Sequence, residues 1–285
     1  MADPRWFKNL KWRLRIRAAA AEIRNRCLVA RPHGLDGPLI VSLTSHPARF
    51  PVLHRTLRSV MNQTVAADKV VLTLTEGDEQ ELPPAVTELC AKGLEIRTTP
   101  TNIGSFTKLV PVLRDNPDAC IATCDDDLYI AGDWLEGLVR CAGDHPGRIA
   151  AHRAHRILYD ARGFPLSYEN WDKNIDGAVE GPDIFATGVG GILYPPGSLD
   201  PMVLDEERFM RLCPHGDDLW FYWMARRRGT IVRHVGPKTR IVEWPGSQIT
   251  SLRAANRGVP HDNGNDRAIA ALINELGLPD SGEPL

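Results

Sequence analysis

Three consecutive aspartates follow an apolar stretch in the sequence CDDDLYI, residues 124–130. Adjacent carboxylates repel one another and are costly to desolvate, so we expect a cationic partner beside them. In an extended segment side chains alternate, which would place Asp125 and Asp127 on one side and Asp126 on the other. Two carboxylates on one side suit Mg²⁺ or Mn²⁺, which proteins often hold together with substrate phosphates. The alternative is a solvated turn or helix cap, where aspartate is also common.

A second acidic pair, Asp217 and Asp218, lies much later in the chain, in the sequence HGDDLWFYWMA. A carboxylate within hydrogen-bond reach of an attacking hydroxyl group can accept its proton and act as a general base. The structural alternative is that both residues only begin a helix, because negative charge is favourable at a helix N-terminus. The two acidic groups are therefore candidates for a cation site and a base, provided that the fold brings them together.

The elements that must position these groups alternate between strand-like and helical patterns. Four apolar, strand-like runs are each followed by apolar residues at helical spacing, and these runs are 39–43, 69–74, 94–99 and 119–124. Successive strand–helix units predict a mostly parallel α/β sheet with helices on both faces. In such sheets ligands bind beyond the carboxyl ends of the strands, where the three aspartates are expected.

Further elements are expected around and after these units. Pro111 should kink or shorten the third helix, because proline lacks a backbone N–H group. The later elements that we predict are a hairpin turning at 161–163, a helix over 217–228, a strand over 230–235 and a short helix ending at Gly277.

Composition and charge exclude several classes of protein. The 285 residues have the hydrophobic (43%) and charged (25%) content of a soluble globular protein. The net charge is −2, but residues 1–26 hold eight Lys and Arg against two acidic residues, which argues against nucleic-acid binding and for a local attachment surface. No segment has the pattern of a membrane span or signal peptide. Six scattered cysteines without a C-x-x-C pair predict buried free thiols and a cytoplasmic location.

Five segments in order resemble a nucleotide-sugar glycosyltransferase of the GT-A (Rossmann-like) fold, close to glycosyltransferase family 2. They are VSLTSHPAR (41–49), NQTVAADKVVLTL (62–74), NIGSFTKL (102–109), CDDDLYI (124–130) and HGDDLWFYWMA (215–225). The resemblance covers roughly residues 38–235. It implies a nucleoside diphosphate sugar as donor, a D-x-D motif that holds Mn²⁺ or Mg²⁺, and transfer of a hexosyl group to a glycan acceptor.

The resemblance also implies roles for residues near the donor. Thr44, Ser45 and Arg49 would lie near its base, ribose or phosphates. Glu76 stands where the family often has a base-reading aspartate, although TEGD departs from the usual DDGS. These four positions would form the nucleotide side of the cleft.

Of the next two segments of the resemblance, one would cover the nucleotide and the other would hold the metal ion. Asn102 and Lys108 match the segment that closes over the nucleotide, although Lys108 would equally suit a surface position on a first helical turn. Asp125 would lie near the ribose with Asp126 beside it, and Asp127 would be the direct metal ligand.

On the acceptor side, the resemblance makes Asp218 the general base and Asp217 the residue that orients substrate or backbone. A later histidine sometimes completes the metal site in GT-A enzymes, and His234 is the candidate here, with a structural histidine as the alternative. The role of His215 stays open. The glycine-rich stretch ATGVGGILYPP (186–196) allows close approach of backbone to a ligand, or is a bulged strand.

The basic N-terminal segment is expected to form a helix that mixes aromatic and cationic residues over 4–26. Such a composition suits contact with an anionic membrane surface, although Arg13 and Arg17 interrupt its apolar face and leave a partner-binding helix or a dimerisation arm open. We therefore expect a cytoplasmic protein that is peripheral at the inner face of the membrane. The expected organisation is an N-terminal helix (1–30), a GT-A catalytic domain (31–250) and a C-terminal helical tail (251–285).

Together these patterns predict a metal-dependent, inverting glycosyltransferase that adds single sugars to a glycan or lipid-linked glycan, as in polysaccharide biosynthesis. The Q-x-x-R-W element of processive synthases is absent from the sequence. Two alternatives remain at this point. One is a nucleotidyltransferase or phosphohydrolase that uses the aspartates for metal, and the other is a non-catalytic protein that binds nucleotides or glycans.

Overall fold

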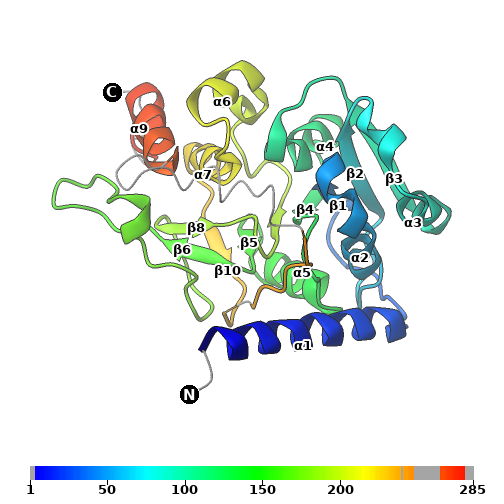
Figure 1. The fold of residues 1–285 in the computed structure, drawn as a ribbon. Helices are drawn as coiled ribbons and strands as arrows, with labels where there is room; N and C mark the ends of the chain where they lie inside the picture. The colour runs from blue at the N-terminus through cyan, green and yellow to red at the C-terminus, as the bar shows by residue number, and fades with distance from the viewer. Residues whose placement is uncertain (1–3, 239, 247–263, 280–285) are drawn as a thin grey trace.

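The computed structural model describes residues 4–238, 240–246 and 264–279. Within them, the chain forms an eight-stranded sheet in the order β3–β2–β1–β4–β9–β5–β10–β7 and a two-stranded sheet of β6 and β8 (Figure 1). The strands are β1 (Leu39–Thr44), β2 (Lys69–Thr75), β3 (Leu94–Thr99), β4 (Cys120–Thr123), β5 (Ile149–Ala151), β6 (Ala154–Arg156), β7 (Glu180–Gly181), β8 (Ile184–Ala186), β9 (Ile192–Tyr194) and β10 (Val232–His234).

The large sheet is parallel over its first half and mixed over its second. Strands β3, β2, β1 and β4 run parallel to their neighbours, and β5 pairs parallel with β10. Strand β9 lies antiparallel between β4 and β5, and β7 is an antiparallel edge on β10. The four predicted strands correspond to β1–β4, so the prediction of a mostly parallel α/β sheet is confirmed.

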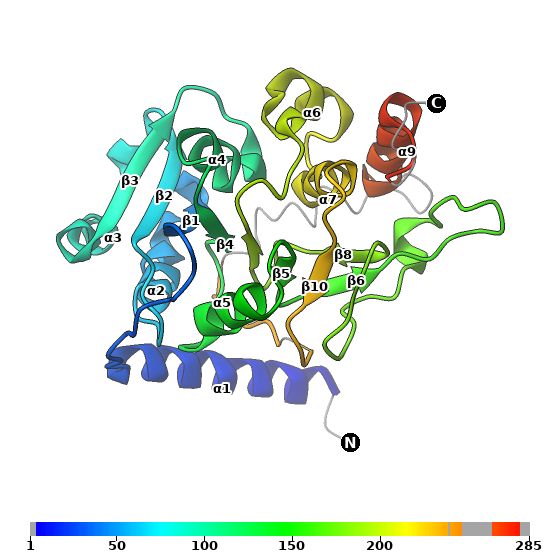
Figure 2. The same ribbon diagram turned by 180° about the vertical axis from the view of Figure 1, so that it is seen from behind.

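Helices cover both faces of this sheet (Figures 1 and 2). The α-helices are α1 (Pro4–Asn25), α2 (Phe50–Val60), α3 (Pro84–Thr87), α4 (Val110–Asp115), α5 (Trp134–Asp144), α6 (Glu206–Leu212), α7 (Asp217–Arg227) and α9 (Gly264–Leu276). The short 3-10 helices are η1 (Pro47–Arg49), η2 (Asp78–Glu81), η3 (Glu88–Lys92), η4 (Gly104–Lys108), η5 (Tyr168–Asn170) and η6 (Pro201–Leu204).

The alternation of β1 divides its buried side chains between two cores. Leu39, Val41 and Leu43 pack with α2, α3 and α5 on one face. Ile40 belongs to the core on the other face, which is built from η4, α4, α6 and α7, with α9 packed outside. Because successive side chains of a strand point to opposite faces, one apolar run supplies both cores.

Local expectations are met except at Pro111 and at two cysteines. This proline begins α4 immediately after η4 instead of kinking a longer helix, because the first turn of a helix needs no N–H group from that residue. The predicted hairpin is present, with a bridge between Tyr159 and Pro165 around Gly163. All six cysteines are free, but Cys27 and Cys90 are exposed and not buried as expected.

The terminal helices flank the sheet. The predicted basic N-terminal helix is present as α1, which lies along the outside of the molecule (Figure 1). The predicted C-terminal tail begins at 251, and its first part, 251–263, lies outside the described residues, whereas α9 packs against α6 and α7. Within the described ranges, no helix combines the length and hydropathy that crossing a membrane requires.

Candidate active site

The three aspartates lie where the chain leaves β4 and turns. Asp126 is buried and accepts hydrogen bonds from the Ser45 hydroxyl and from Nη1 of Arg49. The same Arg49 nitrogen lies 3.4 Å from Oδ2 of Asp127. The expected alternation, with Asp126 apart from its neighbours, is therefore not observed, because β4 ends at Thr123 and the chain turns at 126–127. The expected cationic partner is present as Arg49.

The first aspartate of the group faces a different cation. Nζ of Lys108 lies 2.9 Å from Oδ1 of Asp125 and 3.2 Å from Oδ2 of Asp217. Lys108 is only 7% exposed, so it is not the surface lysine that the sequence also allowed. A second contact holds Asp217, whose Oδ1 accepts from the Ser105 hydroxyl at 2.8 Å. One lysine thus joins the two acidic groups into one site.

Asp218 follows on the first turn of α7 and is held by backbone. The N–H group of Gly188 donates to both carboxylate oxygens, at 3.0 and 2.9 Å. Burial raises the pKa of Asp218 to about 7, the negative charge of Asp217 adds to the increase, and Lys108 opposes it. The carboxylate therefore titrates near neutral pH, where a general base is most effective.

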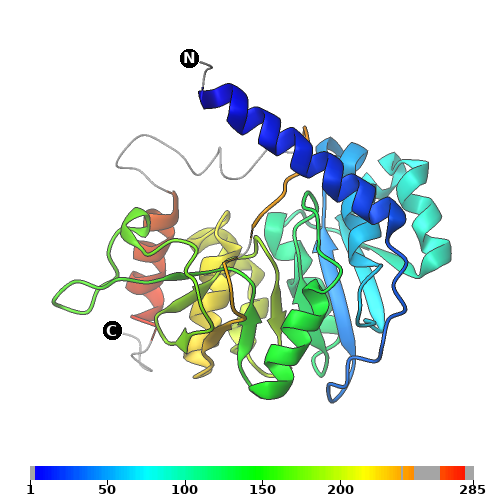
Figure 3. The ribbon, with the colours of Figure 1, turned by 90° about the horizontal axis from the view of Figure 1, so that it is seen from below.

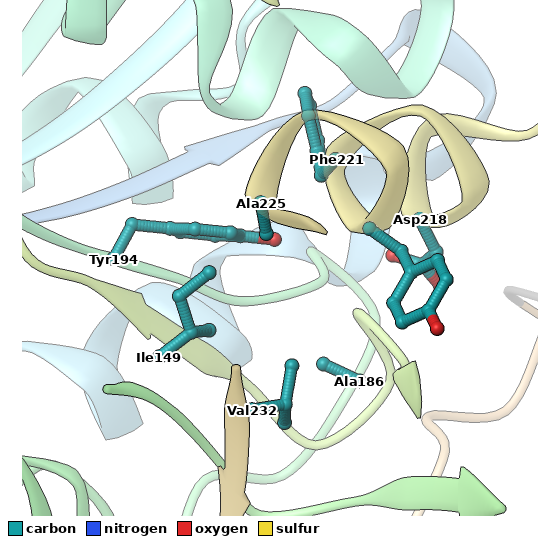
Figure 4. A pocket seen from close by; sticks show the side chains of 8 residues that line it. Ile149, Ala186, Tyr194, Asp218, Phe221, Ala225 and Val232 are labelled. Carbon is teal, nitrogen blue, oxygen red and sulfur yellow. The ribbon is translucent and has the colours of Figure 1, made fainter. Parts of the chain in front are cut away.

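An apolar pocket beside Asp218 explains this loss of solvation (Figure 4). Its lining comes from β5, β8, β9, β10 and α7 and includes Ile149, Tyr194, Phe221, Ala225 and Val232. Burial also raises the pKa of Tyr194, and the nearby charge of Asp218 adds to that increase. Phenol and carboxylic acid thus share a region of low polarity in which their neutral forms are favoured.

The cations of the site keep their charge despite burial. Burial lowers the pKa of Lys108, but Asp125 and Asp217 outweigh it, and the pKa lies well above its usual value. Burial likewise disfavours the Arg49 guanidinium, but Asp126 and the other aspartates raise its pKa. Each acidic residue after β4 therefore has a fixed positive charge opposite it, which offsets the repulsion within the group.

Three other predicted donor residues occupy the ends of β1, β2 and β3. The Thr44 hydroxyl donates to the Thr73 carbonyl oxygen at 2.8 Å and so joins β1 to β2. Glu76 is exposed just after β2, and Asn102 accepts from the Gly104 N–H at 3.0 Å and so stabilises the turn into η4. These three side chains contact neighbouring backbone or solvent, not the aspartates.

The two histidine candidates lie in different surroundings. His234 is fully buried, with Nδ1 2.7 Å from the Gly177 carbonyl oxygen and Nε2 3.1 Å from that of His152. Both ring nitrogens of His234 therefore face backbone carbonyl oxygens, and neither faces a carboxylate. His215 is exposed in the turn before α7.

Sequence reasoning missed two residues of this site, Ser105 and Gly188. The only signals were the serine inside NIGSFTKL and the glycines of ATGVGG. A Cβ atom at Gly188 would lie 3.0 Å from Nζ of Lys108 and 3.1 Å from Oδ1 of Asp218. The glycine therefore allows backbone, lysine and carboxylate to meet in one place.

The donor chemistry of the aspartates fits a divalent cation of the Mg²⁺ or Mn²⁺ type. No group of three or more His, Cys, Asp or Glu side chains within the described ranges forms a metal cage. Such a cage is not required, because these ions are commonly held by one or two carboxylates while substrate phosphates supply other ligands. Asp125 and Asp127, the ligands that the resemblance implies, would have to hold the ion while they face two different cations, Lys108 and Arg49.

Comparisons with known proteins add little to this geometry. No protein-family model matches the sequence, and no curated protein matches it. Among solved structures, the chain is similar to the mannosyltransferase PcManGT from Pyrobaculum calidifontis in complex with GDP-Man and Mn²⁺, at 16% identity and a TM-score of 0.36. The match covers 53% of this chain and 44% of that chain, so this protein spans less than half of its length.

Proposed function

We propose that this protein is a metal-dependent, inverting glycosyltransferase that moves one sugar from a nucleoside diphosphate donor to a hydroxyl group of a glycan or lipid-linked glycan. One observation carries the proposal. Lys108 pairs with Asp125 after β4 and with Asp217 at the start of α7, at 2.9 and 3.2 Å. Two acidic groups that are far apart in the sequence thereby belong to one site, as a reaction with a charged leaving group and an attacking hydroxyl group requires.

The donor side of the reaction needs positive charge. As the bond between sugar and nucleotide breaks, negative charge develops on the departing diphosphate, and preorganised cations stabilise it. Arg49 and Lys108 supply two such cations at the carboxyl ends of the strands, where ligands bind in sheets of this type. A divalent cation held by Asp125 and Asp127 would add further neutralisation of the diphosphate.

The acceptor side needs a base whose pKa lies near neutral pH, so that its ionised form is populated and still binds a proton well. Asp218 suits this role because its pKa is raised to about 7 and Gly188 holds its carboxylate in one orientation. The carboxylate accepts the proton of the acceptor hydroxyl group as that oxygen attacks the sugar. Attack on the side opposite the leaving diphosphate inverts the configuration at the anomeric carbon.

Product analysis tests the proposal. The full chain is incubated with a panel of UDP-, GDP- and dTDP-sugars and Mn²⁺, with and without oligosaccharide acceptors. We expect release of a nucleoside diphosphate that falls by about 10²–10⁴-fold in Asp218→Asn and is unchanged in Asp144→Asn, an exposed control at the end of α5. Release of pyrophosphate or inorganic phosphate would instead identify a nucleotidyltransferase or phosphohydrolase. Tight donor binding without any turnover would identify a binding protein.

A further inference from the structure

The outward surface of α1 carries an apolar line. Leu10 and Leu14 are 40% and 54% exposed, and Ala18 is exposed one turn further on. Residues four apart lie on the same side of a helix, so these three side chains follow one another along α1. Scattered exposed leucines are ordinary on protein surfaces, so the meaning of this line depends on what borders it.

Basic residues border this line on both sides. With 100° of rotation per residue, Lys11 and Arg15 lie along one edge of the line, and Arg13 and Arg17 lie along the other. All four side chains are exposed. The nearest acidic residue on the described part of the helix is Glu22, whose carboxylate is engaged by Arg26 at 2.7 and 2.8 Å. The two arginines that interrupt the pattern in the sequence therefore border the apolar line in space.

The opposite face of α1 is fixed to the body of the protein. Ile16 and Ala19 are buried against Trp244, with Ile23 and Tyr129 packed beside them. Figure 3 shows α1 running across the outside of the molecule, with its N-terminal part extending beyond the rest of the domain. Since this packing fixes the rotation of the helix about its axis, the apolar line must face away from the protein.

Arg26 secures the end of the helix. Its guanidinium donates to the backbone carbonyl oxygens of Ser59, Asn62 and Ile130, at 2.9, 3.0 and 2.8 Å. The Arg26 side chain is only 2% exposed, in contrast with the four exposed cations further along α1. Arg26 thus attaches the end of the helix, whereas Lys11, Arg13, Arg15 and Arg17 are exposed to solvent.

We propose that the outward face of α1 binds the surface of an anionic lipid bilayer, with the helix lying in the plane of the membrane. Leu10 and Leu14 would enter the boundary between headgroups and acyl chains, while the flanking Lys and Arg side chains reach anionic headgroups. A second copy of the same face is a poorer partner, because its four cations would meet four identical cations. Charge complementarity therefore favours the membrane over self-association.

The inward face of α1, opposite this docking surface, is connected to the candidate active site through Trp244. The N–H group of Trp244, which seats α1, donates to the carbonyl oxygen of Asp127 at 2.9 Å. Leu128, the next residue, forms a β-bridge with Glu243. Membrane binding through α1 would therefore hold the acidic site at a fixed orientation to the bilayer, which suits a lipid-linked acceptor. The surface itself does not depend on the proposed transferase activity.

Vesicle flotation of the full chain tests the proposal, with phosphatidylcholine vesicles and vesicles that also contain phosphatidylglycerol. We expect binding to the anionic vesicles only, and a loss of about tenfold or more in Leu10→Glu/Leu14→Glu and in Arg13→Glu/Arg17→Glu. The matched control Lys92→Glu/Arg114→Glu makes the same charge change as Arg13→Glu/Arg17→Glu, at exposed positions in η3 and α4, and should bind like the original protein. Circular dichroism checks that all three variants are folded.

Three results would overturn the proposal. The first is absence of the unmodified protein from the anionic vesicle fraction at low salt. The second is equal loss of binding in the control variant. The third is a dimer in analytical ultracentrifugation that dissociates in Leu10→Glu/Leu14→Glu while vesicle binding is absent, which would assign the surface to a second copy. Nucleoside diphosphate release measured in the same samples separates a failure of membrane docking from a failure of the proposed activity.

Discussion

The backbone N–H group of Gly188 donates to both carboxylate oxygens of Asp218, at 3.0 and 2.9 Å. Gly188 lies in the loop between β8 and β9. These hydrogen bonds therefore fix the position of that loop relative to the first turn of α7. Lys108 lies at the same point, because a Cβ atom on Gly188 would approach its Nζ to 3.0 Å. Asp218, Lys108 and Gly188 therefore lie in mutual contact, and a substitution at any one of them should displace the other two.

Replacing Gly188 with alanine should lower turnover by about ten- to a hundredfold, since displacement of catalytic groups by an ångström has effects of that order. The added methyl group must displace Lys108 or Asp218 from its present position. Steady-state kinetics measure the loss. Gly143→Ala is the matched control, because a Cβ atom there meets nothing within 4 Å and the residue lies in α5. Equal activity in Gly188→Ala and Gly143→Ala would contradict the proposed arrangement.

Asp218→Asn should reduce turnover by about 10²–10⁴-fold, because the amide cannot accept the hydroxyl proton. The unmodified protein should lose activity as the pH falls through about 7, since that is the pKa of the carboxylate and only its ionised form is a base. Turnover should level off at higher pH. A pH–rate profile measures both features. The range from pH 5.5 to pH 8 extends about one unit or more on either side of the Asp218 pKa. A rate that is independent of pH over this range would exclude Asp218 as the base.

Lys108→Met should move the acid limb of the pH–rate profile to higher pH. Lys108 lowers the pKa of Asp218, so removing its charge lets that pKa rise further above its ordinary value. The free energy of unfolding should also fall, by about 3–5 kcal/mol, because Asp125 and Asp217 lose their common buried partner. Urea denaturation measures this, and Lys92→Met at an exposed position should change neither quantity. An unshifted acid limb would show that Lys108 and Asp218 are not coupled.

Removal of divalent cations should abolish release of nucleoside diphosphate, and Mn²⁺ or Mg²⁺ should restore it. The same ions should raise the melting temperature in the presence of a nucleoside diphosphate, because a ligand that binds only the folded state stabilises it. Asp127→Asn should weaken both responses, since it removes a charged oxygen ligand. Full activity in EDTA would contradict the requirement for a divalent cation. Arg49 and Lys108 would then be the cations of the donor site.

Much of the fold was predictable because its signals are local. The four apolar runs became β1–β4, and the helices after Asp217 and before Gly277 formed within a few residues of the expected positions. Strand β9 lies within the glycine-rich stretch 186–196, for which the sequence left a bulged strand open, but its antiparallel place between β4 and β5 was not predicted, since its three residues contain nothing that specifies it. The pairing partners of a short strand depend on the rest of the sheet, and the sequence of the strand itself does not specify them.

The candidate site was predictable only in its residue types. The acidic groups were evident, but their partners were not, because Arg49 and Lys108 come from segments that are distant in the sequence. The alternation expected for Asp125–Asp127 failed because it assumes an extended chain, and the chain turns at 126–127. Gly188 was missed for a different reason: its contribution is a backbone N–H group, which every residue except proline possesses.

The sequence by itself determined the alternation of strands and helices, the presence of two acidic groups and the basic character of the first helix. Those properties follow from periodicity and charge, which are fixed by neighbouring residues. Only the tertiary structure decided that Lys108 lies between Asp125 and Asp217, that Asp218 lies beside an apolar pocket, and that Leu10 and Leu14 face outward. Each of these depends on contacts between segments far apart in the chain, and it is such contacts that set burial and therefore charge state.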